Sequence, residues 1–231
     1  MFDFLTFLAL SLQGAILGLL VVAVRRRNVP AAVNALASLA LAVVPTALEL
    51  GFRAVGEPLA LDPLLAVWLG VAGFLHSIGM LGLYDSTWWW DHLTHTISAA
   101  LVAAFFYAAL LVAVPSVPAR TPVVGVGAIT VATTFAIGVF WELIELVARD
   151  VADRLDVDPV LVHYGWRDTA IDLVFDVVGA VVIVVLDVQV FVSIVEQFPA
   201  LTEGMVIASG WGVAIVSVAM ALFVTVGSIR T

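Results

Sequence analysis

The sequence contains neither cysteine nor lysine, and both absences narrow its possible functions. Without cysteine, disulfide bonds, thiolate metal sites and cysteine nucleophiles are excluded. All 9 basic residues are arginine and the formal net charge is −9, which argues against nucleic-acid binding because that function requires basic patches. The Asp-rich, Lys-free composition suggests a salt-adapted source.

Charge of either sign is scarce, since 12% of the 231 residues are charged and 63% are hydrophobic. A water-soluble domain could not cover so much apolar surface with polar groups. The composition therefore predicts an integral membrane protein whose main partner is the lipid bilayer. The first apolar run follows no basic segment, so we expect a retained helix and not a cleaved signal.

Apolar segments long enough to cross a ~30 Å hydrocarbon core recur along the chain. They predict an all-α membrane bundle of about seven transmembrane helices, forming a single domain over residues 1–231. The stretch 187–203 fits either an extension of the sixth helix or a segment along the membrane interface. The expected helices cover residues 4–24, 31–50, 63–83, 92–113, 122–147, 169–187 and 205–227.

Arginines predict the orientation in the plasma membrane, because short cytoplasmic loops carry an excess of basic residues. Under seven alternating spans, only Arg53 and Arg120 fall on the outer side. This predicts an outer N-terminus and a cytoplasmic C-terminus. The cytoplasmic side receives Arg25, Arg26, Arg27, Arg149, Arg154, Arg167 and Arg230, and five tryptophans fall at the same helix ends: Trp88, Trp89, Trp90, Trp141 and Trp166.

Polar residues gather where three of the expected helices meet the cytoplasmic interface. Residues three and four apart share one face of a helix, so Asp91 with His95, Glu142 with Glu145, and Asp168 with Asp172 and Asp176 form one-sided stripes. The groups are Asp91, His92 and His95 at the start of the fourth helix, Glu142 and Glu145 at the end of the fifth, and Arg167, Asp168, Asp172 and Asp176 at the start of the sixth.

Depth makes one of these residues costly. At ~1.5 Å per residue, Asp176 lies roughly 12 Å along the helix from Asp168. An unpaired carboxylate at such depth costs at least a few kcal/mol, so Asp176 needs a partner, a proton or water. His76 is expected at a comparable depth and is a candidate partner.

Histidine and carboxylate side chains suit a divalent ion such as Zn, Mn or Fe, which a bundle core can bind. The same groups could instead form a proton relay or a general acid/base pair, with His95, Glu142, Asp172 and Asp176 as the catalytic candidates. The spacing of these residues is compatible both with a metal site and with a proton relay or acid/base pair. The metal-ligand candidates are His95, Asp91, Glu142, Glu145, Asp168 and Asp172.

Simpler roles compete with these. Asp91 and Asp168 fall where helix N-caps belong, and a cap satisfies backbone N–H groups without any catalysis. Glu142 and Glu145 could be solvated charges at the interface. A purely structural role explains Asp172 and Asp176 least well, because buried acids in membrane helices usually have a function.

These residues resemble the motifs of the VanZ-like and YjdF-like families of membrane proteins. VanZ-like proteins carry Asp-x-x-x-His at a helix start, Glu-x-x-Gln at a helix end, then Arg and Asp-x-x-x-Asn-x-x-Gly. The matching residues here are Asp91 and His95, Glu142 and Glu145, then Arg167, Asp172, Asp176 and Gly179; the YjdF-like pattern resembles Trp141-Glu142, Asp168-Thr169, Asp172 and Gly179-Ala180.

Three positions depart from the VanZ-like pattern: His92 replaces Lys, Glu145 replaces Gln and Asp176 replaces Asn. These departures make the group more acidic and richer in histidine, which favours metal binding. The resemblance covers about residues 85–186. It implies a small multi-helix membrane protein, associated in one branch with glycopeptide resistance and envelope phenotypes, and it supplies no established reaction.

The leading hypothesis is a cytoplasm-facing site, metal-dependent in its favoured form, that acts on a lipid-linked or amphiphilic envelope substrate. Arg167 would hold an anionic head group of that substrate. The first alternative, motivated by Asp176 and His76 at depth, is a proton- or cation-coupled transporter. The second is a non-catalytic accessory protein in which the polar group only locks three helices together.

Overall fold

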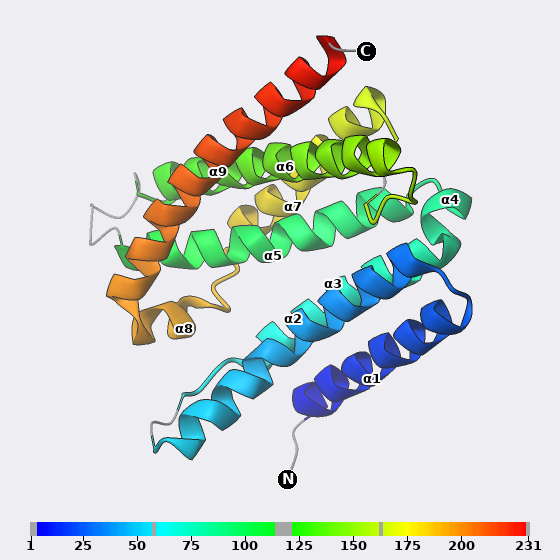
Figure 1. Cartoon of the computed structure of the whole chain (residues 1–231). Coiled ribbons are helices and arrows are strands. Elements are labelled where there is room, and N and C mark those ends of the chain that lie inside the picture. The colour runs from blue at the N-terminus through cyan, green and yellow to red at the C-terminus, as the bar shows by residue number, and fades with distance from the viewer. Residues whose placement is uncertain (1–3, 57–58, 114–121, 162–163, 230–231) are drawn as a thin grey trace. The chain divides into compact units, whose positions relative to one another are not determined.

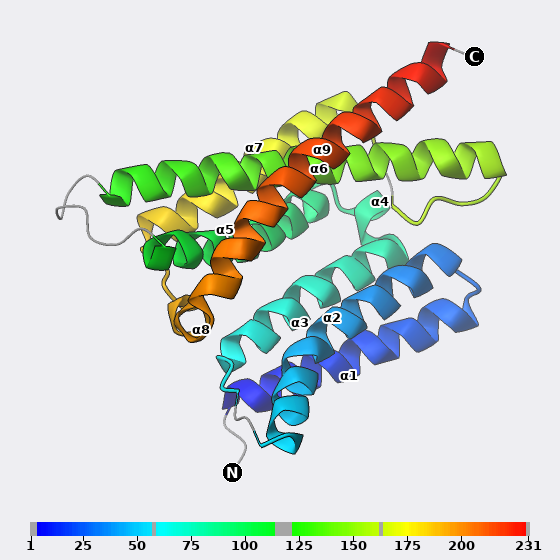
Figure 2. The same ribbon diagram turned by 60° about the vertical axis from the view of Figure 1, so that its left-hand side comes forward.

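The computed structural model describes residues 4–56, 59–113, 122–161 and 164–229, and every regular element within them is a helix (Figures 1 and 2). This confirms the predicted all-α class. The chain divides into two compact units, Met1–Thr94 and His95–Thr231. Two arginines that entered the predicted orientation, Arg120 and Arg230, lie outside the described residues.

Three helices make up most of the first unit: α1 (Phe4–Arg25), α2 (Val29–Ala54) and α3 (Pro63–Ile78), which pack against one another. Asn28 caps α2 by accepting a hydrogen bond from the Ala31 amide, and Asp62 caps α3 by accepting one from Leu64. A proline in the first turn follows each cap. Both helices therefore begin with signals that are local in the sequence.

After α3 the chain forms a π-helical turn, η1 (Gly79–Leu83), and a short helix, α4 (Tyr84–Ser86). Gly82 has a φ of 130°, a conformation that favours glycine. A Cβ built on Gly79 would lie 2.5–2.9 Å from three atoms of the Tyr84 ring, so glycine is needed there as well. The expected third helix thus contains a distorted turn that brings Tyr84 back against α3.

The second unit contains most of α5 (Trp90–Ala113), together with α6 (Pro122–Leu155), α7 (Trp166–Val185), α8 (Val192–Gln197) and α9 (Pro199–Ile229). Within this unit, α6 packs against both α7 and α9. The stretch 187–203 does not extend α7, because α7 ends at Val185 and the separate helix α8 intervenes.

Helix α6 continues beyond its expected end at residue 147 and stops at Leu155. Two ion pairs with helical i,i+4 spacing support the extension: Arg149 Nε lies 4.0 Å from Asp153 Oδ2, and an Arg154 guanidinium nitrogen lies 2.7 Å from Asp150 Oδ2. Such exposed pairs contribute about 0.3–0.5 kcal/mol each. Because these residues are charged, hydropathy did not predict that the helix extends beyond residue 147.

A polar link closes the far end of α7. Asp187 has a φ of 49° just after the helix, and its carboxylate accepts hydrogen bonds from Gln189 at 2.8 Å and from the buried Tyr107 hydroxyl of α5 at 2.7 Å. The bonds from Gln189 and Tyr107 hold the pKa of Asp187 below its usual value. This link ties the C-terminal end of α7 to α5.

Six helices of the described chain are long and apolar enough to cross a membrane: α1, α2, the segment Pro63–Ser86, α5, Gly125–Leu155 of α6 and Pro199–Phe223 of α9. Their exposed surfaces carry many large apolar side chains, which indicates a lipid bilayer environment. The seventh expected span, α7, has a comparable length but carries three aspartates. Its composition alone would not place it in a membrane.

Candidate functional site

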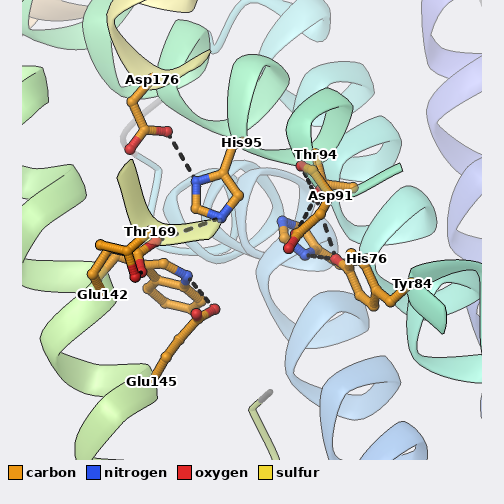
Figure 3. Close-up of polar contacts among 10 residues, drawn as sticks. His76, Tyr84, Asp91, Thr94, His95, Glu142, Glu145, Thr169 and Asp176 are labelled. Atoms are coloured by element: carbon orange, nitrogen blue, oxygen red, sulfur yellow. Dashed lines mark hydrogen bonds and ion pairs between the residues drawn. The ribbon is translucent and has the colours of Figure 1, made fainter. Parts of the chain in front are cut away.

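His95 is the centre of the polar group in the second unit (Figure 3). Its side chain lies in α5 and is buried, with 7% of its surface exposed. Its Nδ1 atom lies 3.1 Å from Asp176 Oδ1 of α7, and its Nε2 atom lies 4.0 Å from Glu142 Oε1 of α6. One imidazole ring therefore contacts carboxylates from two other helices.

The two deep aspartates of α7 are four residues apart and share one face of the helix. Only 2% of Asp172 and 4% of Asp176 is exposed. Of the alternatives expected for Asp176, a partner, a proton or water, the structure shows a partner, but it is a different residue from the candidate His76. Asp176 pairs with His95, whereas His76 hydrogen-bonds Tyr84, with 2.6 Å between its Nδ1 and the phenol oxygen.

Glycines allow α7 to come close to its neighbours in this unit. A Cβ built on Gly179 would lie 2.5 Å from the backbone oxygen of Thr96 and 3.0 Å from the amide nitrogen of Ala100, both in α5. A Cβ built on Gly138 of α6 would overlap Asp176 Oδ2. The close approach at these two positions brings the acidic face of α7 beside His95.

Glu142 is held by a residue that sequence reasoning did not rank among the site residues. Its Oε2 atom accepts a hydrogen bond from the Thr169 hydroxyl of α7 at 2.6 Å, and 6% of Glu142 is exposed. Thr169 and Glu142 are 27 positions apart in the sequence. No spacing rule links residues on two helices, so only the packing of α6 and α7 could identify this contact.

One ligand atom from each of Asp91, His95 and Asp172 lies within 4.8 Å of the other two. Asp91 precedes His95 by one helical turn in α5, so the helix itself carries both side chains on one face. His95 and Asp172 are buried and Asp91 is half-buried. These three residues are close enough together to bind one metal ion.

Charge makes this group unusual for the interior of a membrane protein. Glu142, Asp172 and Asp176 bring three carboxyl groups to one buried histidine. Imidazole and carboxylate groups gathered in this way are the ligand types that suit a bound divalent cation.

Other predicted site residues lie at the edge of this group or away from it. Glu145 accepts a hydrogen bond from Trp141 Nε1 at 2.9 Å, and it is half-buried. Arg167 is exposed, with its guanidinium 5.5 Å from the centre of the Trp166 ring. His92 is buried and meets the Trp88 ring edge-on at 6.2 Å.

The predicted N-cap roles of Asp91 and Asp168 are wrong. Helix α5 begins at Trp90, and the N-cap of α7 is Gly165, so both aspartates lie inside the first turn. Each still favours its helix there, because a negative charge near the N-terminus interacts well with the helix dipole. Asp168 is half-buried.

These features define a class: an all-α membrane protein with several apolar helices and a buried group of histidine and carboxylates. The chain belongs to the family described as predicted membrane protein (DUF2238), whose family model matches residues 7–193. The matched range contains every residue of the site and ends within α8. No curated protein and no solved structure matches the chain.

Membership in this family confirms the predicted multi-pass membrane class. The resemblance to the VanZ-like and YjdF-like families rests on the short motifs alone and stays a prediction.

Proposed function

We propose that the protein binds a divalent metal ion at His95, Asp172 and Asp91 and uses it on a lipid-linked or amphiphilic substrate. The observation that carries the proposal is the convergence of these three side chains within 4.8 Å, two of them buried. Metal sites of this kind combine imidazole with carboxylates, and Zn, Mn and Fe all accept that ligand set.

The contacts of the histidine support this proposal. Nδ1 of His95 lies 3.1 Å from Asp176, and metal-binding histidines usually donate their second ring N–H to such a carboxylate. Nε2 then faces Glu142 Oε1 at 4.0 Å. Two ligand atoms on one tetrahedral zinc ion lie about 3.4 Å apart, so Glu142 needs only a small shift to become a fourth ligand or to act as a general base.

The chemistry would divide among the residues as follows. His95, Asp172 and Asp91 hold the ion, which when bound supplies a Lewis acid and lowers the pKa of a coordinated water. Glu142, held by Thr169, receives or returns a proton. Asp176 orients the imidazole.

Exposed aromatic and basic groups near the start of α7 support an amphiphilic substrate. Trp166 is 75% exposed and lies beside the Arg167 guanidinium. Tryptophan favours the head-group region of a bilayer, and arginine binds phosphate and carboxylate groups. An anionic head group held by Arg167 would lie near the interface, and its attached chain would extend into lipid.

The test of this proposal is elemental analysis of the purified protein after incubation with Zn, Mn or Fe salts and removal of excess ion. We expect about one ion per chain in the natural protein, and loss of that ion in His95→Ala and Asp172→Asn. Glu145→Gln is a matched control, because it removes a carboxylate that accepts a hydrogen bond from Trp141 and does not belong to the three-residue group. A natural protein with no stoichiometric ion would overturn the proposal.

The buried pair of His95 and Asp176 also supports the alternative of a proton- or cation-coupled transporter, because intramembrane acids often mark ion pathways. The two functions differ in a flux assay with the protein in sealed vesicles. If the protein is a transporter, the natural protein should carry a proton or cation flux and Asp176→Asn should abolish it. If it is a metal-dependent enzyme, neither the natural protein nor Asp176→Asn should carry such a flux.

We further propose a single domain over residues 1–231 that lies in the plasma membrane with seven spans, α7 included, an outer N-terminus and a cytoplasmic site. The natural chain contains no cysteine, so single cysteines can be introduced into it directly to test the orientation. In intact cells, a membrane-impermeant maleimide should label Val55→Cys and not Ser86→Cys; both positions are exposed. The opposite labelling would reverse the orientation.

A further inference from the structure

The second carboxylate oxygen of Asp176 is confined in a way that the proposed function does not yet explain. Oδ1 pairs with His95 Nδ1 at 3.1 Å. Oδ2 is buried and has no hydrogen-bond partner among the described residues. A Cβ built on Gly138 of α6 would overlap this oxygen and would lie 3.2 Å from Asp176 Cγ. Gly138 therefore forms the wall against which the carboxylate rests.

We propose that Gly138 is a positioning residue for the metal site. Its missing side chain leaves the space in which the Asp176 carboxylate can hold the Nδ1–H of His95. A neutral imidazole carries one N–H, so this contact places the proton on Nδ1 and the lone pair on Nε2, the nitrogen that faces Glu142. The inference rests on the proposed function only for the consequence that a metal ligand is oriented.

A methyl group at position 138 could not be absorbed easily. The same built Cβ lies 3.1 Å from Leu173 Cδ2, so Asp176 would have to move within a packed interface. Asp176 has a short side chain with few rotamers, and its other oxygen is already engaged by His95. The added methyl must therefore break the contact with His95 or push α6 away from α7.

Gly125→Ala provides a matched control in the same helix. Among the described residues, a Cβ built on Gly125 meets no atom within 4 Å beyond the local backbone of α6, and both substitutions replace glycine by the better helix former. Any difference between Gly125→Ala and Gly138→Ala therefore reports the contacts with Asp176 and Leu173 at position 138 and not the loss of a glycine from α6.

The experiment has two readouts. Zinc affinity, measured by competition with a chromophoric chelator, should fall about 10–100-fold in Gly138→Ala, which is the usual effect of losing a carboxylate that orients a metal-binding histidine, and should stay unchanged in Gly125→Ala. In metal-free protein with ¹⁵N-labelled histidine side chains, the His95 signal should show the Nδ1–H tautomer in the natural protein and lose it in Gly138→Ala. His95→Gln assigns that signal.

The outcomes separate this inference from the proposed function. If the natural protein binds no zinc but Gly138→Ala still loses the Nδ1–H tautomer, the positioning role holds and the metal proposal fails. If Gly138→Ala keeps the tautomer, the positioning role is overturned, whatever happens to zinc.

A second pair of variants covers the case in which Gly138→Ala does not fold. In an Asp176→Ala background the added methyl has no carboxylate to meet, so Gly138→Ala should fold there and should change zinc affinity no further. Failure of the double variant to fold, or a further loss of affinity in it, would show that the methyl acts elsewhere and would overturn the inference.

Discussion

We expect His95→Ala to lower the free energy of unfolding by about 3–5 kcal/mol, because it leaves the buried Asp176 carboxylate without the group that donates a hydrogen bond to it. The substitution leaves the Asp176 carboxylate, which is 4% exposed, without the side chain that contacts it at 3.1 Å. It also removes the group that lies 4.0 Å from Glu142. Unfolding in mixed micelles with chelator present measures this effect without a contribution from bound metal.

Two further variants test whether the charge of Asp176 causes this loss. Asp176→Asn removes the charge but keeps the shape, so we expect a smaller loss of about 1–3 kcal/mol from an imperfect hydrogen bond. Combining His95→Ala with Asp176→Asn should cost less than the sum of the two single losses, because the double variant no longer leaves a charged carboxylate at position 176 without its histidine. Additive losses would mean that His95 and Asp176 do not interact.

The second large effect is expected at Gly179. Gly179→Ala should lower the free energy of unfolding by about 1–3 kcal/mol, although alanine is the better helix former. The reason is that the new Cβ would lie 2.5 Å from a backbone oxygen of α5, and backbone cannot move aside as a side chain can. The helices α5 and α7 must separate, and the separation should also weaken zinc binding by moving Asp172 away from His95.

Gly210→Ala in α9 is the control for this prediction. Among the described residues, no atom beyond the local backbone of α9 lies within 4 Å of a Cβ built on Gly210, so alanine should stabilise the helix by about 0.5–1 kcal/mol through the lower entropy of the unfolded chain. Equal effects at the two glycines would show that α5 and α7 do not approach closely at Gly179. Unfolding curves of the three proteins under one condition provide the comparison.

Much of the local structure could be predicted because it depends on residues close in the sequence. Long apolar runs indicated the helices, and the four-residue spacing of Asp172 and Asp176 correctly indicated one acidic face. The helix ends were predicted less well. Hydropathy missed the last turns of α6, where Arg149 and Asp153 pair along the helix, and placed Asp168 at a cap that Gly165 occupies.

The partners of buried residues could not be predicted in the same way. His76 was a candidate partner of Asp176 because their expected depths match, but depth leaves open which side of each helix faces which neighbour. The π-helical turn after α3 places Tyr84 beside His76. Gly138 shares a face of α6 with Glu142, a signal that was present in the sequence and whose meaning depended on α7.

By itself, the sequence determined that this is an all-α membrane protein with a histidine and a set of carboxylates at the ends of three helices, because burial of apolar runs and helical spacing are local properties. Only the tertiary structure decided that His95 contacts Asp176 and Glu142, and that Thr169 holds Glu142. Those contacts depend on how closely α7 approaches α5 and α6. That approach is set by backbone and side-chain atoms meeting Gly179 and Gly138 across helix interfaces, which no spacing along one helix encodes.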